Sequence, residues 1–69
     1  MKPFNITKAK DGDPVRFKGY DMGEIQILHF AEDRIHVTYL TRYGAVNQTF
    51  VNRAGDHSDD ACYSLCMEE

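Results

Sequence analysis

Short runs of alternating apolar and polar residues fill most of the chain after its opening segment, a pattern typical of β-strands. The run 35–42 is the clearest case, because Ile35, Val37 and Tyr39 fall on one side. The polar residues of this run fall on the other side: His36, Thr38 and Arg42. The shorter run 15–18 alternates in the same way. The pattern therefore predicts strands with one buried face.

The run 24–31 (EIQILHFA) breaks this alternation. Ile25 and Ile27 are in one phase, whereas Leu28 and Phe30 are in the other. Such a shift is expected where a β-bulge adds a residue, or where a central strand is buried on both faces. The sequence leaves both interpretations open.

Two further strands are predicted in the second half of the chain. The segment 46–51 (VNQTFV) follows Gly44, which suits the positive φ of a hairpin turn. The polar segment 52–60 is predicted to be an exposed loop, and 62–67 (CYSLCM) is predicted to close the domain. The residues expected on one face of this last strand are Tyr63, Leu65 and Met67.

The opening segment predicts one short helix over about residues 6–11. Asn5 precedes it and is a good N-cap, because its side-chain oxygen accepts a backbone N–H of the first turn. Gly12 suits the left-handed position after a helix, and Pro14 prevents the helix from continuing. A helix this short needs to dock on the strands to be stable.

These elements predict a single small domain over residues 1–69 of the mainly β (α+β) class. After the helix we expect an antiparallel meander or small SH3-like barrel of four to five strands, joined by Gly and Asp turns. A chain of 69 residues builds only one thin core. A binding module is therefore expected more than an enzyme with a deep cleft.

Charge and hydropathy restrict the partners and the location. The net charge is −3, and residues 54–69 hold acidic side chains but no Lys or Arg. An acidic chain without a basic stripe is not expected to bind nucleic acid. No apolar run is long enough for a signal peptide or a membrane span. With only two cysteines, the chain is predicted to be a cytoplasmic protein.

The residues with metal-binding or catalytic chemistry are sparse. Cys62 and Cys66 are four residues apart, and His57 is the nearest histidine. A structural zinc site needs four ligands, and no second ligand pair is present. A small metal-binding site using His57 and Cys62 is kept as an alternative, while no catalytic residue and no cofactor is predicted.

His29 and His36 lie on consecutive predicted strands of a hairpin, so they are expected to be cross-strand neighbours. Such a pair forms a metal site or a pH-sensitive switch in some proteins, and in others consists of two half-exposed side chains facing solvent. The sequence favours the second interpretation.

The aromatic residues divide between a core and two turns. Those assigned to the core are Phe4, Phe17, Phe30, Tyr39 and Phe50. Tyr20 and Tyr43 fall at turns, where an amphipathic ring either contacts a partner or folds over the end of the barrel. Together with the loop carboxylates Asp56, Asp59 and Asp60, they are the predicted partner-binding residues.

The opening MKPFNITKAKDGDPVRF, the run IQILHF and the ending YSLCM resemble a group of small uncharacterised phage and prophage proteins. The residues that match its N-terminal motif best are Phe4, Asn5, Ala9, Gly12, Pro14 and Val15. The segment RFKGYDMGE departs from the simpler turn of that group. The resemblance implies a bacterial host cell as the setting and no particular chemistry.

The sequence therefore predicts a non-enzymatic protein-interaction module of phage or prophage origin that binds a protein partner. A homodimer joined through a strand edge is a variant of this prediction. A different alternative is an acidic mimic of nucleic acid that inhibits a host enzyme, which would depend on Asp56, Asp59 and Asp60.

Overall fold

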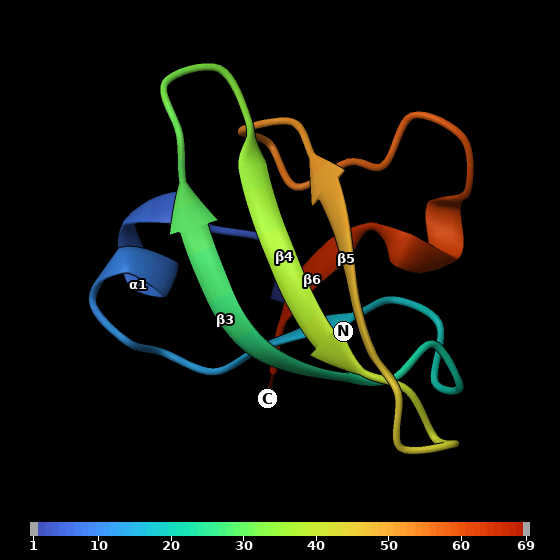
Figure 1. The fold of residues 1–69 in the computed structure, drawn as a ribbon. Coiled ribbons are helices and arrows are strands. Elements are labelled where there is room, and N and C mark those ends of the chain that lie inside the picture. The colour runs from blue at the N-terminus through green and yellow to red at the C-terminus, as the bar shows by residue number, and fades with distance from the viewer. Residues whose placement is uncertain (1, 69) are drawn as a thin grey trace.

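The computed structural model describes residues 2–68 and shows a small, mainly β fold with one short α-helix. The elements, in chain order, are β1 (Lys2–Pro3), α1 (Ile6–Lys10), β2 (Val15–Phe17), β3 (Glu24–Phe30), β4 (Ile35–Leu40), β5 (Val46–Val51), the 3-10 helix η1 (Ala61–Tyr63) and β6 (Leu65–Met67). Figure 1 shows β3, β4 and β5 in front, with β6 behind them and α1 on the β3 side. The predicted fold class is confirmed at this level.

The strands form two three-stranded antiparallel sheets, in the orders β1-β6-β2 and β3-β4-β5. Only the second sheet is a meander. In the first, the C-terminal strand lies between the two N-terminal strands, with Pro3 opposite Cys66 and Val15 opposite Met67. This pairing joins the two ends of the sequence, and no local pattern signals it.

The predicted helix is present as α1, one residue shorter than expected. The side chain of Asn5 accepts a hydrogen bond from the backbone N–H of Lys8 at 3.2 Å, as the N-cap prediction requires. Asp11 is the C-cap, and Gly12 follows with a φ of 96°. The left-handed backbone at Gly12 turns the chain towards Pro14 and β2.

The phase shift in β3 is a β-bulge. The pairing of β3 with β4 shifts register between Ile25 and Ile27, so Gln26 is the inserted residue. Because of the bulge, Ile25 and Leu28 share the inner face, whereas Ile27 is on the outer face with Thr38 opposite. The alternative of a central strand is wrong, because β3 is an edge strand and β4 is central.

The C-terminal segment differs from its prediction at both ends. Residues Ala61–Tyr63 form η1 rather than strand, and the Asp60 side chain caps it by accepting the N–H of Cys62 at 2.9 Å. The strand β6 is buried at every position rather than on alternate ones. Burial at consecutive positions means that both faces of β6 are covered, with Leu65 in the core between the sheets.

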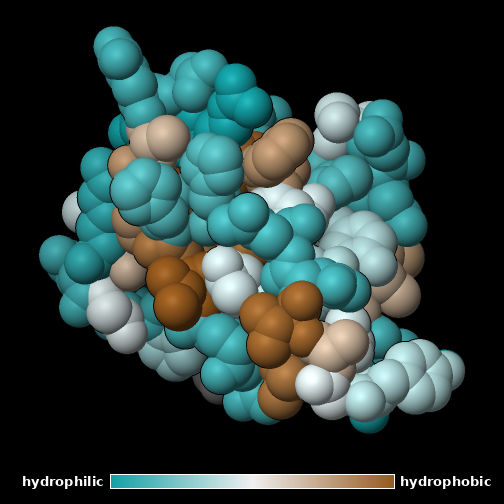
Figure 2. Space-filling view, in the orientation of Figure 1, coloured by the Kyte–Doolittle hydropathy of each residue, from teal (hydrophilic) through white to brown (hydrophobic). Residues whose placement is uncertain are grey.

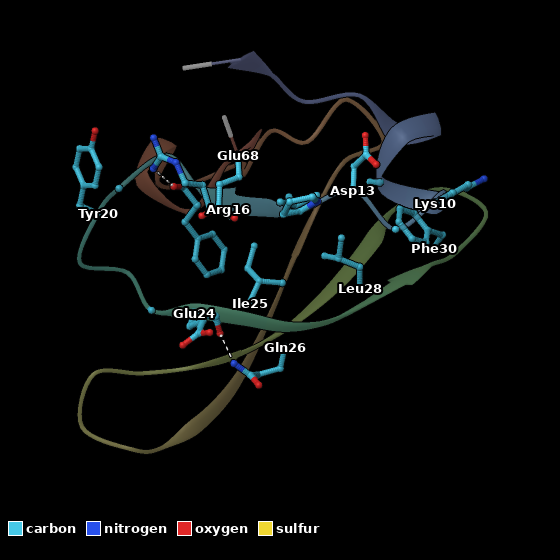
Figure 3. A pocket seen from close by; sticks show the side chains of 17 residues that line it. Lys10, Asp13, Arg16, Tyr20, Glu24, Ile25, Gln26, Leu28, Phe30 and Glu68 are labelled. Carbon is cyan, nitrogen blue, oxygen red and sulfur yellow. Dashed lines mark hydrogen bonds between the residues drawn. The ribbon is translucent and has the colours of Figure 1, made fainter.

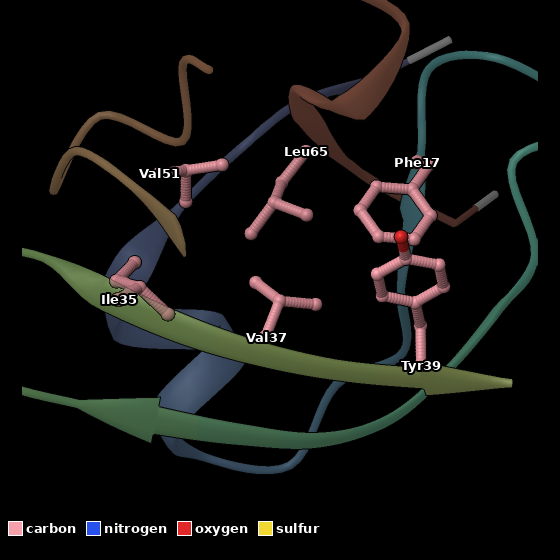
Figure 4. Packing of buried hydrophobic residues seen from close by; sticks show 6 residues of the cluster. All are labelled: Phe17, Ile35, Val37, Tyr39, Val51 and Leu65. Atoms are coloured by element: carbon pink, nitrogen blue, oxygen red, sulfur yellow. The ribbon is translucent and has the colours of Figure 1, made fainter. Parts of the chain in front are cut away.

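The core lies between the two sheets and consists of six buried side chains, drawn in Figure 4: Phe17, Ile35, Val37, Tyr39, Val51 and Leu65. The ring of Phe17 packs edge-on against Tyr39, with centroids 5.1 Å apart, and against Tyr63 at 5.5 Å. Such pairs add about 0.5–1.5 kcal/mol beyond area burial. The inner face of β4 therefore provides half of the core, as its alternation predicted.

Candidate functional site

One face of the sheet β3-β4-β5 points away from the core, and we call it the outer face. The registers place its residues in three rows across the strands: His29, His36 and Phe50; Ile27, Thr38 and Gln48; Glu24, Leu40 and Val46. Within residues 2–68, no other strand pairs with this sheet, and the second sheet lies on its opposite face. The outer face is therefore open to contact by another molecule.

Large apolar side chains are exposed on this outer face. Ile27 is 61% exposed, Val46 is 66% exposed and Phe50 is 52% exposed. Figure 2, in the orientation that places this sheet in front, shows hydrophobic surface among hydrophilic side chains. Single exposed apolar residues are ordinary on protein surfaces, but several on one sheet face make a candidate contact surface.

Charged and aromatic groups line one end of the outer face. The ring of His36 lies between His29, at 5.8 Å, and Phe50, at 5.5 Å between centroids. The guanidinium of Arg34 lies 5.3 Å from the Phe50 ring centroid and pairs with Asp33 at 3.4 Å. The hydrogen bond and charge of Arg34 lower the pKa of Asp33, and His36 adds to this effect. This end of the face therefore combines apolar contact with fixed charge.

The two edge strands of the sheet β3-β4-β5, β3 and β5, each have one long edge that is not paired with another described strand. β3 and β5 each pair only with β4 within the part of the chain that the structure describes. Unpaired backbone N–H and C=O groups along such an edge can accept a strand from another chain. The edges of β3 and β5 border the outer face, so one partner can contact the outer face and one of these edges at the same time.

A groove of about 720 Å³ lies between β2, α1 and β3. Figure 3 shows Ile25 and Leu28 pointing from β3 towards β2 to form its apolar floor. The charged and polar residues along its rim are Lys10, Asp13, Arg16, Tyr20, Glu24 and Glu68. Both signs of charge alternate along this rim, so the groove does not favour a ligand of one charge.

The two tyrosines predicted to bind a partner point into solvent. Tyr20 is 87% exposed and Tyr43 is 82% exposed, so neither ring folds over the core. Each is covered on one side by an arginine: Arg16 lies 4.8 Å from the Tyr20 centroid, and Arg42 lies 5.2 Å from that of Tyr43. Their two turns lie at the same end of the sheet (Figure 1).

The predicted carboxylates belong to a different part of the molecule. The loop 52–60 lies at the opposite end of the sheet (Figure 1), where Arg53 donates to the carbonyl of Ala31 at 2.9 Å. Asp56 and Asp59 are exposed there, whereas Asp60 is engaged as the cap of η1. The five predicted partner-binding residues therefore do not form one surface.

His57 is held by hydrogen bonds through both ring nitrogens. Its Nδ1 accepts the backbone N–H groups of Asp59, at 3.2 Å, and Asp60, at 3.0 Å. Its Nε2 lies 3.0 Å from the hydroxyl of Thr49, and the ring packs on Tyr63 at 5.5 Å. Because Nδ1 accepts, the neutral ring donates from Nε2. A metal ion at His57 would have to displace these bonds.

The two cysteines are free thiols in different environments. Cys62 is exposed in η1, and Cys66 is buried in β6. Gly19 packs against Cys62 so closely that a Cβ on Gly19 would lie 2.8 Å from the cysteine Cβ. Among residues 2–68, no group of three or more His, Cys, Asp or Glu side chains is gathered as a metal site.

No helix among the described residues is long and apolar enough to cross a membrane. Comparisons of the chain with protein-family models, with curated proteins and with solved structures find no match.

Sequence reasoning missed the apolar part of the outer face. Phe50 was assigned to the core, but it is half-exposed because it lies opposite His36, which faces outward. Ile27 faces outward because of the bulge, and Val46 lies in the same phase as Phe50. The sequence already indicates that His36 faces outward. With the strand register known, that assignment would also have placed Phe50, Ile27 and Val46 on the outer face.

Proposed function

We propose that this protein is a non-enzymatic protein-interaction module that binds a partner protein through the outer face of the sheet β3-β4-β5. The observation that carries the proposal is the exposure of Ile27, Val46 and Phe50 on one open sheet face. These side chains add little to folding, because they lie on the side away from the core. Covering them with a partner removes apolar surface from water, at about 25 cal/mol per Å².

The chemistry of the outer face favours a protein over a small molecule. The face is broad and bears aromatic, aliphatic and histidine side chains, with the Asp33–Arg34 ion pair at its border. Protein interfaces combine aromatic, aliphatic and polar side chains in a similar way. A small ligand would need a concave site that covers most of its surface.

The free edges of β3 and β5 support a second mode of contact. A partner strand that pairs with β5 would extend the sheet and lie beside Val46 and Phe50. Two copies joined through the same edge would form the homodimer variant of this function. Sedimentation over a range of concentrations separates the variants, because only the homodimer shows a mass that rises with its own concentration.

A site-specific cross-linking experiment tests the proposal. A photoreactive phenylalanine analogue replaces Gln48, at the centre row of the outer face, or Thr7, which is exposed on α1. We expect a discrete cross-linked product from position 48 and none from position 7. A product from position 7 alone, or none from either position in the cell that makes the protein, would contradict the proposal.

The proposal extends to the fold type, the cellular setting and the origin of the protein. We propose a small SH3-like barrel, supported by the two packed three-stranded sheets. The cytoplasm of a bacterial host and a phage or prophage origin are supported only by the sequence resemblance. The genes that flank this one test the origin, since phage structural or regulatory genes are expected beside it.

A further inference from the structure

His29 and His36 are paired on the outer face. They lie directly opposite each other on the antiparallel strands β3 and β4. Their ring centroids are 5.8 Å apart, and the ring planes are inclined by 60°. The cross-strand contact expected from the sequence is therefore present.

We propose that His29 and His36 together bind one divalent transition-metal ion of the zinc class. Imidazole nitrogen is a preferred ligand of zinc, copper and nickel. Two imidazoles on one tetrahedral zinc ion, with Zn–N bonds of about 2.1 Å, place their ring centroids about 5 Å apart. The observed separation of 5.8 Å reaches that value by a small rotation of the exposed His29 side chain.

The ring nitrogens of this pair are available, in contrast to those of His57. Within residues 2–68, neither His29 nor His36 makes a side-chain hydrogen bond, whereas both nitrogens of His57 are occupied. Metal binding at the pair therefore breaks no hydrogen bond of the fold. This difference separates the proposed site from the alternative that used His57 and Cys62.

The surroundings of the pair restrict its motion and moderate its charge. The ring of Phe50 packs edge-on against His36, with an interplanar angle of 70°, and limits the positions of that imidazole. A cationic group, Arg34, lies on the Phe50 ring beside the pair and is itself paired with Asp33 at 3.4 Å. The carboxylate of Asp33 is close enough to His36 to interact with its charge. The carboxylate of Asp33 therefore offsets part of the repulsion between Arg34 and an added cation.

The chain supplies two ligands, so water or another molecule must supply the rest of a four-coordinate shell. The pair lies on the face that we propose as the partner-binding surface, so the remaining ligands would come from that side. A histidine or carboxylate of a bound protein would complete the coordination there. The metal site itself does not depend on the proposed function, because it is tested with the metal alone.

Isothermal titration calorimetry tests this inference. Zinc chloride is titrated into the purified protein at neutral pH to measure the stoichiometry and the affinity, and the titration is repeated with nickel chloride. All variants carry Cys62→Ser, because an exposed thiol also binds zinc. The background protein is compared with His29→Gln and with His36→Gln, each of which keeps a polar side chain on the surface. Gln48→Ala is the matched control on the same face, and circular dichroism confirms that each variant is folded.

We expect one metal ion per chain in the background protein and in Gln48→Ala. Either histidine variant should lose affinity by about tenfold or more, because loss of even an outer-shell partner costs about 10- to 100-fold. No binding by the background protein, or equal binding by all folded variants, would overturn the inference.

A negative result with metal would leave the proposed function standing, because cross-linking at position 48 does not require a metal ion. Conversely, metal binding without any cross-linked partner would support the site and contradict the interaction module.

Discussion

The two faces of the sheet β3-β4-β5 use the same strands for different purposes. On the inner face, Ile35, Val37 and Tyr39 of β4 are buried against Phe17 and Leu65 of the other sheet. On the outer face, the intervening residues of β4 are only half-buried, and their apolar neighbours on β3 and β5 are more exposed still. The alternation of buried and half-buried residues along β4 thus separates a face that packs the core from a face that is accessible to other molecules.

The hydrophobicity of a residue alone therefore does not show whether it lies in the core. Ile27 and Ile35 have the same side chain on adjacent strands, yet one is mostly exposed and the other is fully buried. Strand register and the bulge decide which face each residue occupies. Single apolar residues that the register directs to solvent are ordinary, but several on one open sheet face make a candidate contact surface.

The largest effect is expected from a matched pair of isoleucine substitutions, Ile35→Ala and Ile27→Ala. Ile35→Ala should lower the free energy of unfolding by about 2–5 kcal/mol, because it removes buried methyl groups and leaves a cavity. Ile27→Ala should lower it by less than about 1 kcal/mol, because a surface substitution leaves no cavity. Urea denaturation of both variants measures the difference.

Equal losses of unfolding free energy in the two isoleucine variants would contradict the proposed difference between the two faces. That result would mean that the outer face contributes to folding, for example through self-association in the folded state. Repeating the denaturation at a tenfold lower protein concentration separates that case, because only an associated protein changes its midpoint with concentration.

Two glycines show the same difference between packed and open parts of the molecule, Gly23 in the connection from β2 to β3 and Gly44 in the hairpin turn between β4 and β5. Gly23 has a φ of 117°, and an added Cβ would lie 2.7 Å from the carbonyl oxygen of Leu40 and 3.0 Å from the ring of Tyr39. Gly44 has a φ of 85° with nothing within 4 Å of an added Cβ. Gly23 therefore lies tightly against the packed side of the sheet, whereas Gly44 lies in open space.

We expect Gly23→Ala to destabilise the protein by about 3 kcal/mol or more, because overpacking adds about 1–3 kcal/mol to the backbone strain. Gly44→Ala carries only the left-handed strain, about 1–2 kcal/mol. Thermal unfolding of the two variants checks the order. A greater loss from Gly44→Ala would show that the close contacts at Gly23 relax without cost.

Local signals made a large part of the fold predictable. The Asn5 cap and Pro14 defined α1, and the regular alternation of β4 identified its buried face. The phase shift in β3 was detected, but only the pairing with β4 distinguishes a bulge from a doubly buried strand. The position of β6 between β1 and β2 was not predictable, because it depends on contacts between the two ends of the sequence.

The candidate site was less predictable than the fold. The strand 46–51 has an apolar residue in both phases, so alternation alone does not say whether Phe50 or Val51 faces the core. The structure buries Val51 and exposes Phe50. Tyr20 and Tyr43 were correctly placed at exposed turns, whereas the paired position of His29 and His36 followed from their places on a hairpin.

A smaller effect is expected at the border of the core, from the titration of Tyr63. The neighbouring Tyr39 hydroxyl, through hydrogen bonding and charge, raises the pKa of Tyr63 above its ordinary value of 10.0, and burial adds to the shift. The folded protein therefore holds this proton more tightly than the unfolded chain. Its contribution to stability is complete below about pH 10 and is lost as the pH rises through the folded pKa.

Tyr63→Phe removes this titration, so the variant should lose less stability than the wild type between about pH 9 and pH 11. Urea denaturation at several alkaline pH values measures the two slopes. Other tyrosines and lysines titrate in both proteins, so the difference between the slopes isolates Tyr63. Identical slopes would mean that Tyr63 does not interact with Tyr39 in the folded protein.

The most direct test of the account compares the wild type with a triple variant, Ile27→Thr, Val46→Thr and Phe50→Thr, as immobilised bait for the protein that cross-links at position 48. Threonine keeps a favourable strand propensity while it removes the apolar contact surface. We predict a folded variant whose capture of that protein falls by about tenfold or more, the equivalent of about 1.4 kcal/mol of binding free energy. Undiminished capture by a fully folded triple variant would show that the outer face is not the binding surface.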